Sequence, residues 1–478
     1  MTIKKKAING VKWTSFSTIM RAVIQLVQLS VVAHFLSAEV LGLYALLQLC
    51  LAFFQIFIGV GIGNAIVHQQ STSERHLSEL FFINLAIAML LAVIFFFAAP
   101  LLAWFFEQHK LTPLLKLMSV VFVIIALSRI HLAQLQKKLE FAVIAKIELL
   151  SSVISFIVVI FFITHGYGLN SLVYGYLLSV SLQTLLFWLL SDFRPRFCYP
   201  ASWHELQQYL NFGVYQTASA VVNYFNSQFD LILVGKIFGT EVLGAYSLIR
   251  QFCFRPAMVI NPVLTRVAFP VMAKLQQSDQ LANVFCRLSQ TLASINFPLY
   301  LALIILAKPI ITLVFGEQWL YMLTVFQLMA SWCLVRSVVN PIGSLLMAVG
   351  KVKLAFKWNF FLLILFPLCI LFGSIWGLIG VAFTLFILQI LLLPGQWWFL
   401  IKQSADISFD KFFTALFIPL SIGITSTFVT LLLMTFLVTF ELWLQLIIGV
   451  TIGGVIYILL SYKFNLLFRY FVNNFIRV

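Results

Sequence analysis

One short segment of this chain occurs twice, and that duplication constrains the fold more than any other feature of the sequence. Residues 31–46 read VVAHFLSAEVLGLYAL and residues 233–248 read LVGKIFGTEVLGAYSL. At a fixed offset of 202 positions, Glu39 matches Glu241, Gly42 matches Gly244 and Tyr44 matches Tyr246. A match of this kind indicates an internal duplication. The sequence therefore predicts two related halves.

Long apolar segments occupy both halves. Hydrophobic residues make up 62% of the 478 residues and charged residues 9%, against roughly 25% charged residues in soluble domains. Apolar stretches of about 18 residues or more recur along the chain, and each can cross a bilayer core of roughly 30 Å as a helix. We therefore expect an all-α integral membrane protein.

We predict about fourteen transmembrane helices, arranged as two six-helix lobes followed by an appended hairpin. The predicted lobes are residues 1–200 and 203–402, and residues 403–478 form the hairpin and a tail. An even number of spans in each lobe gives both lobes the same orientation. The predicted spans lie near residues 13–35, 41–67, 79–105, 112–134, 144–164, 169–190, 208–236, 241–270, 286–308, 319–345, 355–374, 377–400, 412–435 and 441–462.

The formal net charge of +15 is explained by where the Lys and Arg residues lie relative to the membrane. With these spans, 21 Lys and Arg residues lie on one side of the membrane and only four lie on the other: Lys110, Lys116, Lys236 and Lys308. Because positive residues concentrate in cytoplasmic loops, this asymmetry predicts a multi-pass protein with both termini in the cytoplasm. We expect no nucleic-acid partner.

Motifs for cofactors and catalysis are missing from the sequence. The six cysteines are scattered, mostly inside apolar runs, and indicate neither a disulfide framework nor a zinc site. No GxxxxGK[ST] phosphate loop occurs, and no loop is long enough to fold as a catalytic domain. We expect no cofactor, no metal site and no enzymatic activity.

Five arginines lie within the predicted spans, namely Arg21, Arg129, Arg250, Arg255 and Arg336. Each costs about 2.5–3.5 kcal/mol at a bilayer centre, so these arginines must face protein or a wet cavity. Arg129 and Arg336 lie near inner helix ends, where their side chains can reach the interface, and we favour a structural role for both. Glu148, close to Lys146, is interpreted as a local surface charge.

Asp230 and Arg250 form a candidate ion pair. Each lies ten residues from Thr240, which places both at a depth of roughly 15 Å on neighbouring antiparallel helices. The corresponding positions of the first half hold Gln28 and Gln48. The pair is either a structural contact that fixes helix packing or an ion- or proton-responsive latch.

Arg21 and Arg255 are candidate phosphate ligands. Arg255 directly precedes Pro256, where a kinked helix leaves backbone groups for a neighbour or a cavity to satisfy. A guanidinium near the midplane can bind phosphate oxygens through two parallel hydrogen bonds. Arg21 lies roughly 12 Å from the inner end of its span. If both face the space between the halves, they form a cationic site for an anionic headgroup; the alternative is a purely structural role.

Several segments carry a family resemblance. They are DLILVGKIFGTEVLGAYSL at 230–248 with the later AFPVMAKL at 268–275, LQKKLEF at 135–141 with GYGLNSLVYGYLL at 166–178, and SAEVLGLYAL at 37–46. With these segments the chain resembles the Wzx-type polysaccharide exporters, the O-antigen and colanic-acid flippases of the MOP superfamily. That superfamily also contains the MATE exporters and the lipid II flippases. The resemblance covers nearly the whole chain.

The resemblance implies a V-shaped pair of lobes around a cationic cavity in the bacterial inner membrane. Such a protein flips an undecaprenyl-pyrophosphate-linked oligosaccharide outward for the biosynthesis of O-antigen, capsule or exopolysaccharide. The implied partners are this polyprenyl-pyrophosphate-linked oligosaccharide, membrane lipid, a polysaccharide polymerase and a chain-length regulator. Related lipid II flippases use arginines in places comparable to those of Arg21 and Arg255, and Asp230 matches an acidic position of the family.

Two other functions are open at this point. A MATE-like cation-coupled drug antiporter predicts acidic residues that converge in one lobe. The balance of five intramembrane arginines against Asp230 and Glu148 favours an anionic cargo instead. A membrane polymerase or ligase of the same pathway predicts large outer loops with catalytic residues, and the sequence contains no such loop.

Overall fold

The computed structural model describes residues 3–58, 66, 73–196, 203–276, 278, 280–436 and 440–469. Thirteen helices in this part of the chain are long and apolar enough to cross a membrane. One of them, Gln216–Lys274, has 59 residues and is interrupted at Gly239. The φ of 79° and ψ of −178° at Gly239 are non-helical and are open almost only to glycine. This helix therefore supplies two spans, and the expected all-α membrane protein with about fourteen spans is confirmed.

The chain divides into two compact units, Met1–Ser247 and Leu248–Val478. The division falls inside α9 (Trp203–Lys274), eight residues after Gly239. The first unit therefore includes the whole span that precedes Gly239. The lobes 1–200 and 203–402 with the appended region 403–478 stay a prediction, and the first boundary lies outside the described residues.

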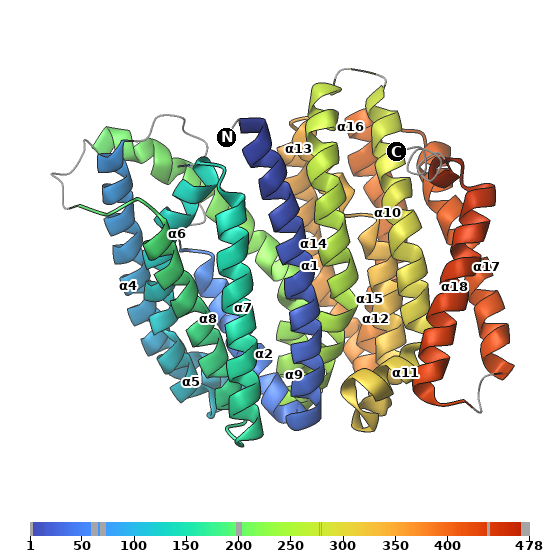
Figure 1. The fold of residues 1–478 in the computed structure, drawn as a ribbon, viewed down its shortest axis with the longest axis horizontal. Helices are drawn as coiled ribbons and strands as arrows, with labels where there is room; N and C mark the ends of the chain where they lie inside the picture. The colour runs from blue at the N-terminus through green and yellow to red at the C-terminus, as the bar shows by residue number, and fades with distance from the viewer. Residues whose placement is uncertain are drawn as a thin grey trace. The chain divides into compact units, whose positions relative to one another are not determined.

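The first unit holds seven complete helices in its described part (Figure 1), followed by the first part of α9. The seven are α1 (Ile3–Phe35), α2 (Ala38–Gln55), α4 (Glu74–Phe105), α5 (Leu111–Met118), α6 (Val120–Lys137), α7 (Phe141–Thr164) and α8 (Leu169–Leu190). Helix α7 packs against α1 and α8, and α6 packs against α4 and α8. Helix α8 therefore lies in the middle of the order α1–α7–α8–α6–α4.

The second unit holds the rest of α9 and the remaining elements. Its α-helices are α10 (Gln280–Ile305), α11 (Ala307–Ile310), α12 (Leu323–Ser337), α13 (Pro341–Ala348), α14 (Val352–Ser374), α15 (Gly377–Gln396), α16 (Gln403–Ala405), α17 (Phe409–Phe436) and α18 (Leu442–Phe464). Two π-helical turns, Ile311–Phe315 and Trp397–Lys402, and a 3-10 turn, Glu317–Met322, connect some of them. The terminal hairpin α17–α18 packs onto this unit mainly through α10.

The order of helix neighbours is the same in the two units. Helix α12 packs against α10 and α15, and α15 packs against α14. These contacts repeat the order in which α6 packs against α4 and α8, and α8 against α7. The recurrence accords with an internal duplication.

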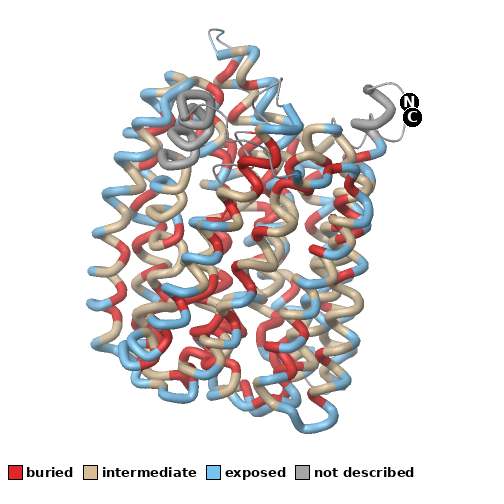
Figure 2. Tube along the Cα trace, turned by 90° about the vertical axis from the view of Figure 1, so that its left-hand side faces the viewer, coloured by how far each residue is buried: buried red, intermediate tan, exposed pale blue. Residues whose placement is uncertain are grey.

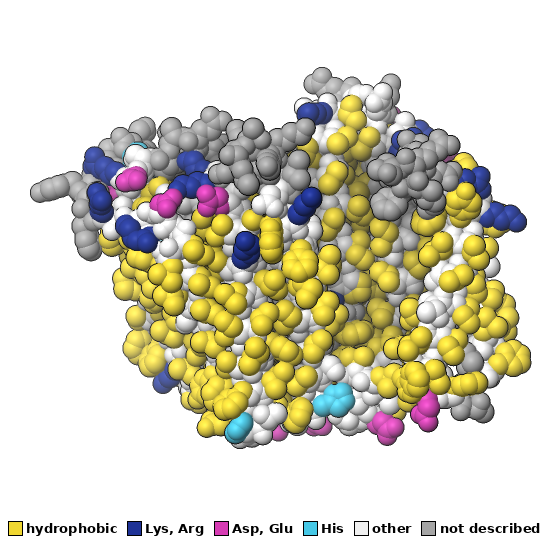
Figure 3. All heavy atoms as spheres, viewed as in Figure 1, with side chains coloured by type: hydrophobic (Ala, Val, Ile, Leu, Met, Phe, Trp, Pro, Cys, Tyr) yellow, Lys and Arg dark blue, Asp and Glu magenta, His cyan; other side chains and the backbone are white. Residues whose placement is uncertain are grey.

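Lipid contact explains why these sequences form helices with apolar outer faces. In hydrocarbon each backbone N–H and C=O must find its partner within the protein, which a helix provides. Figure 2 shows buried and exposed residues alternating along the helices. Large apolar side chains such as Phe97 and Leu391 are 74% and 70% exposed, as suits a lipid-facing surface. In the first unit, Lys and Arg gather at one end of the helices beyond a hydrophobic band (Figure 3).

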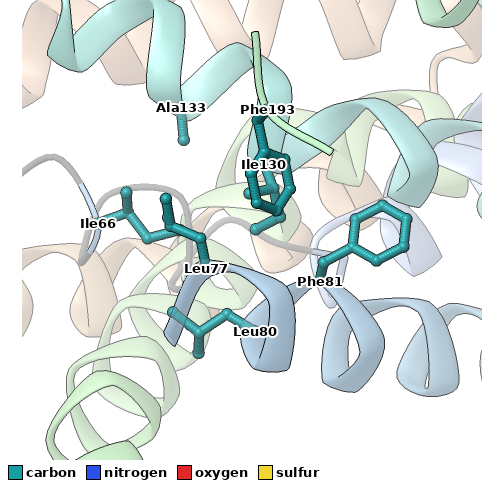
Figure 4. Close-up of a cluster of buried hydrophobic side chains, with 7 residues drawn as sticks. All are labelled: Ile66, Leu77, Leu80, Phe81, Ile130, Ala133 and Phe193. Atoms are coloured by element: carbon teal, nitrogen blue, oxygen red, sulfur yellow. The ribbon is translucent and has the colours of Figure 1, made fainter. Parts of the chain in front are cut away.

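A buried cluster anchors the segment that leaves the first six spans. It contains Ile66, Leu77, Leu80, Phe81, Ile130, Ala133 and Phe193 (Figure 4). Phe193 lies three residues after the end of α8, and the neighbouring Asp192 accepts a 2.6 Å hydrogen bond from Lys138. The segment that follows α8 therefore packs against α4 and α6 through Phe193.

The two copies of the duplicated segment meet each other through their glycines. A Cβ atom on Gly42 of α2 would overlap the carbonyl oxygen of Thr240. A Cβ atom on Gly244 of α9 would overlap the carbonyl oxygen of Ala38. Since Ala38 and Thr240 are also 202 positions apart, the two contacts are reciprocal, as in a contact around a two-fold axis. Glycine is required here because it lets two backbones approach closely.

We predict that Gly42→Ala and Gly244→Ala each destabilise the protein by about 1–3 kcal/mol, because the added methyl group forces two backbones apart. Thermal unfolding in detergent measures the effect. The matched control is Gly454→Ala in α18, where an added Cβ meets nothing within 4 Å. Melting temperatures for G42A and G244A equal to that of G454A would contradict the close approach.

Two ion pairs hold the loop between α4 and α5. Glu107 accepts a 2.7 Å hydrogen bond from Lys236 of α9, and Lys110 lies 2.9 Å from Glu39 at the start of α2. Glu107 has a φ of 56°, a left-handed conformation that costs a non-glycine residue about 1–2 kcal/mol. The hydrogen bond and the charge of Lys236 together lower the pKa of Glu107. The loop thus ties α2 and α9 to the end of α4.

The pKa of Glu107 is lower in the folded protein than in the unfolded chain. Its contact with Lys236 therefore stabilises the fold at pH values above the ordinary glutamate pKa. This stabilisation is lost as the pH falls through the lowered pKa. We predict that wild type is more stable than Lys236→Gln at pH 7. This difference should vanish under acid conditions in which Glu107 is protonated. Thermal unfolding of both proteins across the pH range measures it, and a pH-independent difference would refute the role of the ion pair.

Candidate functional site

Arg21 is paired with a carboxylate inside the first unit. Its Nη2 atom on α1 lies 2.9 Å from Oε2 of Glu148 on α7, and the two side chains are 31% and 29% exposed. The interpretation of Glu148 as a local surface charge was therefore wrong. Sequence spacing could not reveal the pair, because 127 residues separate Arg21 from Glu148 and only the packing of α1 on α7 joins them.

Asp230 lies buried in the first unit, with 4% of its surface exposed. Its Oδ2 atom accepts a 3.1 Å hydrogen bond from the hydroxyl group of Tyr246, one of the duplicated residues. Asp230 and Tyr246 flank Gly239, so this bond links the two spans that α9 supplies. Arg250 belongs to the second unit, where its guanidinium lies 4.7 Å from the ring centre of Phe254. The Asp230–Arg250 pair stays a prediction.

Arg255 is half-buried in the second unit, beside the proline that was expected to disturb its helix. The backbone N–H of Ala257, next to Pro256, donates a 3.2 Å hydrogen bond to the hydroxyl of Tyr300. Tyr300 on α10 is fully buried, so a neighbouring helix satisfies the backbone near the proline. Since Arg21 and Arg255 belong to different units, their shared phosphate site stays a prediction.

Arg336 rests on aromatic rings of the second unit. Its guanidinium lies 5.2 Å from the ring centre of Phe254 and 5.1 Å from that of Trp332. Cation–π contacts of this kind are worth about 2 kcal/mol when desolvated. They offset part of the cost of an arginine within a membrane span.

Sequence reasoning missed a polar network in the second unit. Asn261 donates a 2.8 Å hydrogen bond to the carbonyl of Ser337, and Asn296 donates a 2.9 Å bond to Oδ1 of Asn261. Both asparagines are at least 98% buried. The available signal was the presence of two amides within apolar spans, one of them directly before Pro262. This network ties α9, α10 and α12 together.

In the first unit, α2 and α8 carry a set of hydrogen-bonded glutamine and tyrosine side chains. The Nε2 atom of Gln55 donates a 2.9 Å hydrogen bond to the hydroxyl of Tyr176, and Gln48 donates an equal bond to the hydroxyl of Tyr44. Arg129 of α6 interacts electrostatically with Tyr176.

In the part of the chain that the structure describes, no group of three or more His, Cys, Asp or Glu residues is arranged to hold a metal ion.

Comparison with known sequences gives one family and several relatives. The model of a family described as polysaccharide biosynthesis protein matches residues 31–324. The teichuronic acid biosynthesis protein TuaB of Bacillus subtilis is 30% identical over 97% of this chain and 96% of its own length. The lipopolysaccharide biosynthesis protein WzxC of Escherichia coli is 31% identical over 90% of this chain and 88% of its own length.

Solved structures agree on the fold. The lipid II flippase MurJ, in an inward closed conformation, matches with a TM-score of 0.78 at 17% identity, over 94% of this chain and 98% of its own. An inward-facing MATE multidrug transporter of the MOP superfamily matches with a TM-score of 0.66 at 16% identity, over 84% of this chain and 98% of its own. At these identities the likeness establishes the fold alone.

We predict that Arg21→Gln and Glu148→Gln each lower thermal stability, and that the double variant loses less than the sum. The expected coupling is about 1 kcal/mol, because each single change leaves one charge without its partner. The exposed Lys138–Asp192 pair is the matched control, and its cycle should give a coupling near zero. A purely additive Arg21–Glu148 cycle would show that the contact contributes nothing.

Proposed function

Because this chain belongs to the family of polysaccharide biosynthesis proteins, we propose that it is a flippase for a lipid-linked oligosaccharide. Its cargo is an undecaprenyl-pyrophosphate-linked repeat unit, which it moves outward across the inner membrane for the synthesis of a cell-surface polysaccharide. Two findings support this function. WzxC, a lipopolysaccharide biosynthesis protein, is a relative over most of the chain, and the lipid II flippase MurJ shares the fold.

The main support for this proposal is the excess of positive over negative side chains within the spans. Five arginines lie there, whereas Glu148 is already used by Arg21 and Asp230 by Tyr246. An excess of guanidinium groups at membrane depth suits a cargo with a negative headgroup, since each uncompensated arginine costs about 2.5–3.5 kcal/mol. A bound diphosphate returns part of that cost through charge-assisted hydrogen bonds.

We assign the headgroup to Arg21 and Arg255 and propose that residues 1–200 rock against residues 203–402 around it. Glu148 then has a role of its own. It holds the Arg21 guanidinium in place between transport cycles and keeps its charge compensated when no cargo is bound. Asp230 and Arg250 act in the same proposal as a gating or structural pair within the second predicted lobe.

The direction of transport follows from the cargo's charge. A diphosphate carries about two negative charges, and an inside-negative potential of 100 mV favours outward movement by roughly 2.3 kcal/mol per charge. The positive-inside distribution of Lys and Arg supports cytoplasmic termini. A polysaccharide polymerase and a chain-length regulator are the partners that would receive the flipped unit.

The MATE-like drug antiporter fits the charges less well. Its fold is shared, but five intramembrane arginines against Asp230 and Glu148 favour an anionic cargo over a cationic drug. The two functions differ in what they transport, so the same reconstituted protein can be tested for both.

We predict that the double variant Arg21→Ala, Arg255→Ala inserts normally and lowers surface polysaccharide at least tenfold in cells that lack the native protein. Loss of the two headgroup contacts is the reason. Immunoblotting of extracted polysaccharide gives the readout, and membrane levels of the protein give the control. Undiminished export by this variant would overturn the assignment of the headgroup site.

A further inference from the structure

Arg129 differs from the other intramembrane arginines in its surroundings. Arg21 has a carboxylate partner, and Arg250 and Arg336 lie over aromatic rings. Arg129 forms no hydrogen bond and no ion pair within the described part of the chain, and its Nε atom is buried. Its charge is therefore desolvated without a hydrogen-bonded or ionic partner among those residues.

The position of Arg129 argues against an arginine that merely reaches the membrane surface. It lies eight residues before Lys137, the last residue of α6, or roughly 12 Å from that end. Side chains in a helix lean toward its N-terminus, so Arg129 leans away from Lys137 and toward the membrane interior. Its electrostatic neighbour Tyr176 lies fourteen residues before the end of α8, roughly 21 Å from that end. The expectation that Arg129 reaches the inner interface therefore lacks support from its neighbours.

The groups around Arg129 can bind a polar ligand. The hydroxyls of Tyr176 and Tyr44 accept hydrogen bonds from Gln55 and Gln48. These two bonds do not use the phenolic hydrogens, which can be donated to another group. Tyr44 and Tyr176 also interact electrostatically with each other. A guanidinium and two phenols from α6, α8 and α2 together supply donors for an anionic group and its neighbouring hydroxyls.

The corresponding arginine of the second half is used differently. Leu127 and Arg129 match Leu334 and Arg336 at a common offset of 207 residues (334 − 127 and 336 − 129). Arg336 is covered by Phe254 and Trp332, whereas no aromatic ring of the described residues lies over Arg129. One copy of the duplicated position is thus covered by aromatic rings, and the other is not.

We propose that Arg129 is a cargo-recognition residue that binds an anionic group of the lipid-linked oligosaccharide. The inference rests on the proposed flippase function. The bound group is an oxyanion, either a carboxylate on the saccharide or the diphosphate itself, since a guanidinium fork fits both. Tyr176 and Tyr44 bind adjacent hydroxyl groups of the same cargo.

Binding to protein in nanodiscs, followed by intrinsic tryptophan fluorescence, tests the proposal with two probes. Both are undecaprenyl-pyrophosphate-linked disaccharides; one ends in glucuronic acid and the other in glucose. Arg129→Gln should weaken binding of the acidic probe about tenfold, the typical effect of losing a hydrogen bond to a charged group. A loss for the acidic probe alone identifies a saccharide carboxylate, and equal losses for both probes identify the diphosphate.

Arg336→Gln is the matched control because it removes the same charge from the equivalent position. It should bind both probes within about twofold of wild type; losses equal to those of R129Q would attribute the effect to net charge and overturn the proposal. Wild-type binding by R129Q would overturn it as well. If R129Q does not accumulate, Arg129→Lys carries the test, with an expected loss of about threefold because an ammonium cannot form two parallel bonds. Wild type that binds neither probe would instead refute the proposed function.

Discussion

The cost of placing a guanidinium in a low-dielectric interior determines how the polar side chains of this structure are arranged. Each arginine within a span must contact protein or a wet cavity, because the hydrocarbon itself offers no hydration. The protein uses three different solutions. Arg21 takes a carboxylate from the neighbouring α7, and Arg336 lies against two aromatic rings. Arg129 has neither among the described residues, and in our proposal a negatively charged cargo supplies the third solution.

The helical spans follow from the need to hydrogen-bond every backbone N–H and C=O group inside the hydrocarbon. Helices meet that need along their length, but not at their interruptions. At Pro256 the hydroxyl of Tyr300 accepts the neighbouring N–H, and in α2 the carbonyl of Leu49 accepts a 2.7 Å hydrogen bond from Tyr224. Buried tyrosine hydroxyls thus bond backbone groups of neighbouring helices, while glycines permit the close approach of the duplicated segments. Polar contacts and small residues fix the register of helices whose outer faces only meet lipid.

Much of the fold could be predicted from sequence because it depends on local properties. The length and apolarity of each segment predicted the spans, and the turn at Gly239 to Thr240 fell between two of them, where the structure interrupts α9. The site was harder, since its contacts join residues that are far apart in the chain. Glu148 could not be matched to Arg21 without knowing that α7 packs on α1. The asparagine pair in α9 and α10 was missed for the same reason.

The central claim is that a negatively charged lipid-linked saccharide crosses the membrane through this protein. Reconstituted vesicles containing undecaprenyl-pyrophosphate-linked disaccharide, with the membrane potential clamped on or off, test it directly when an external probe scores the exposed headgroup. We expect translocation that requires the protein and accelerates with an inside-negative potential. Absence of translocation, together with ion-coupled efflux of a soluble cation by the same vesicles, would contradict it.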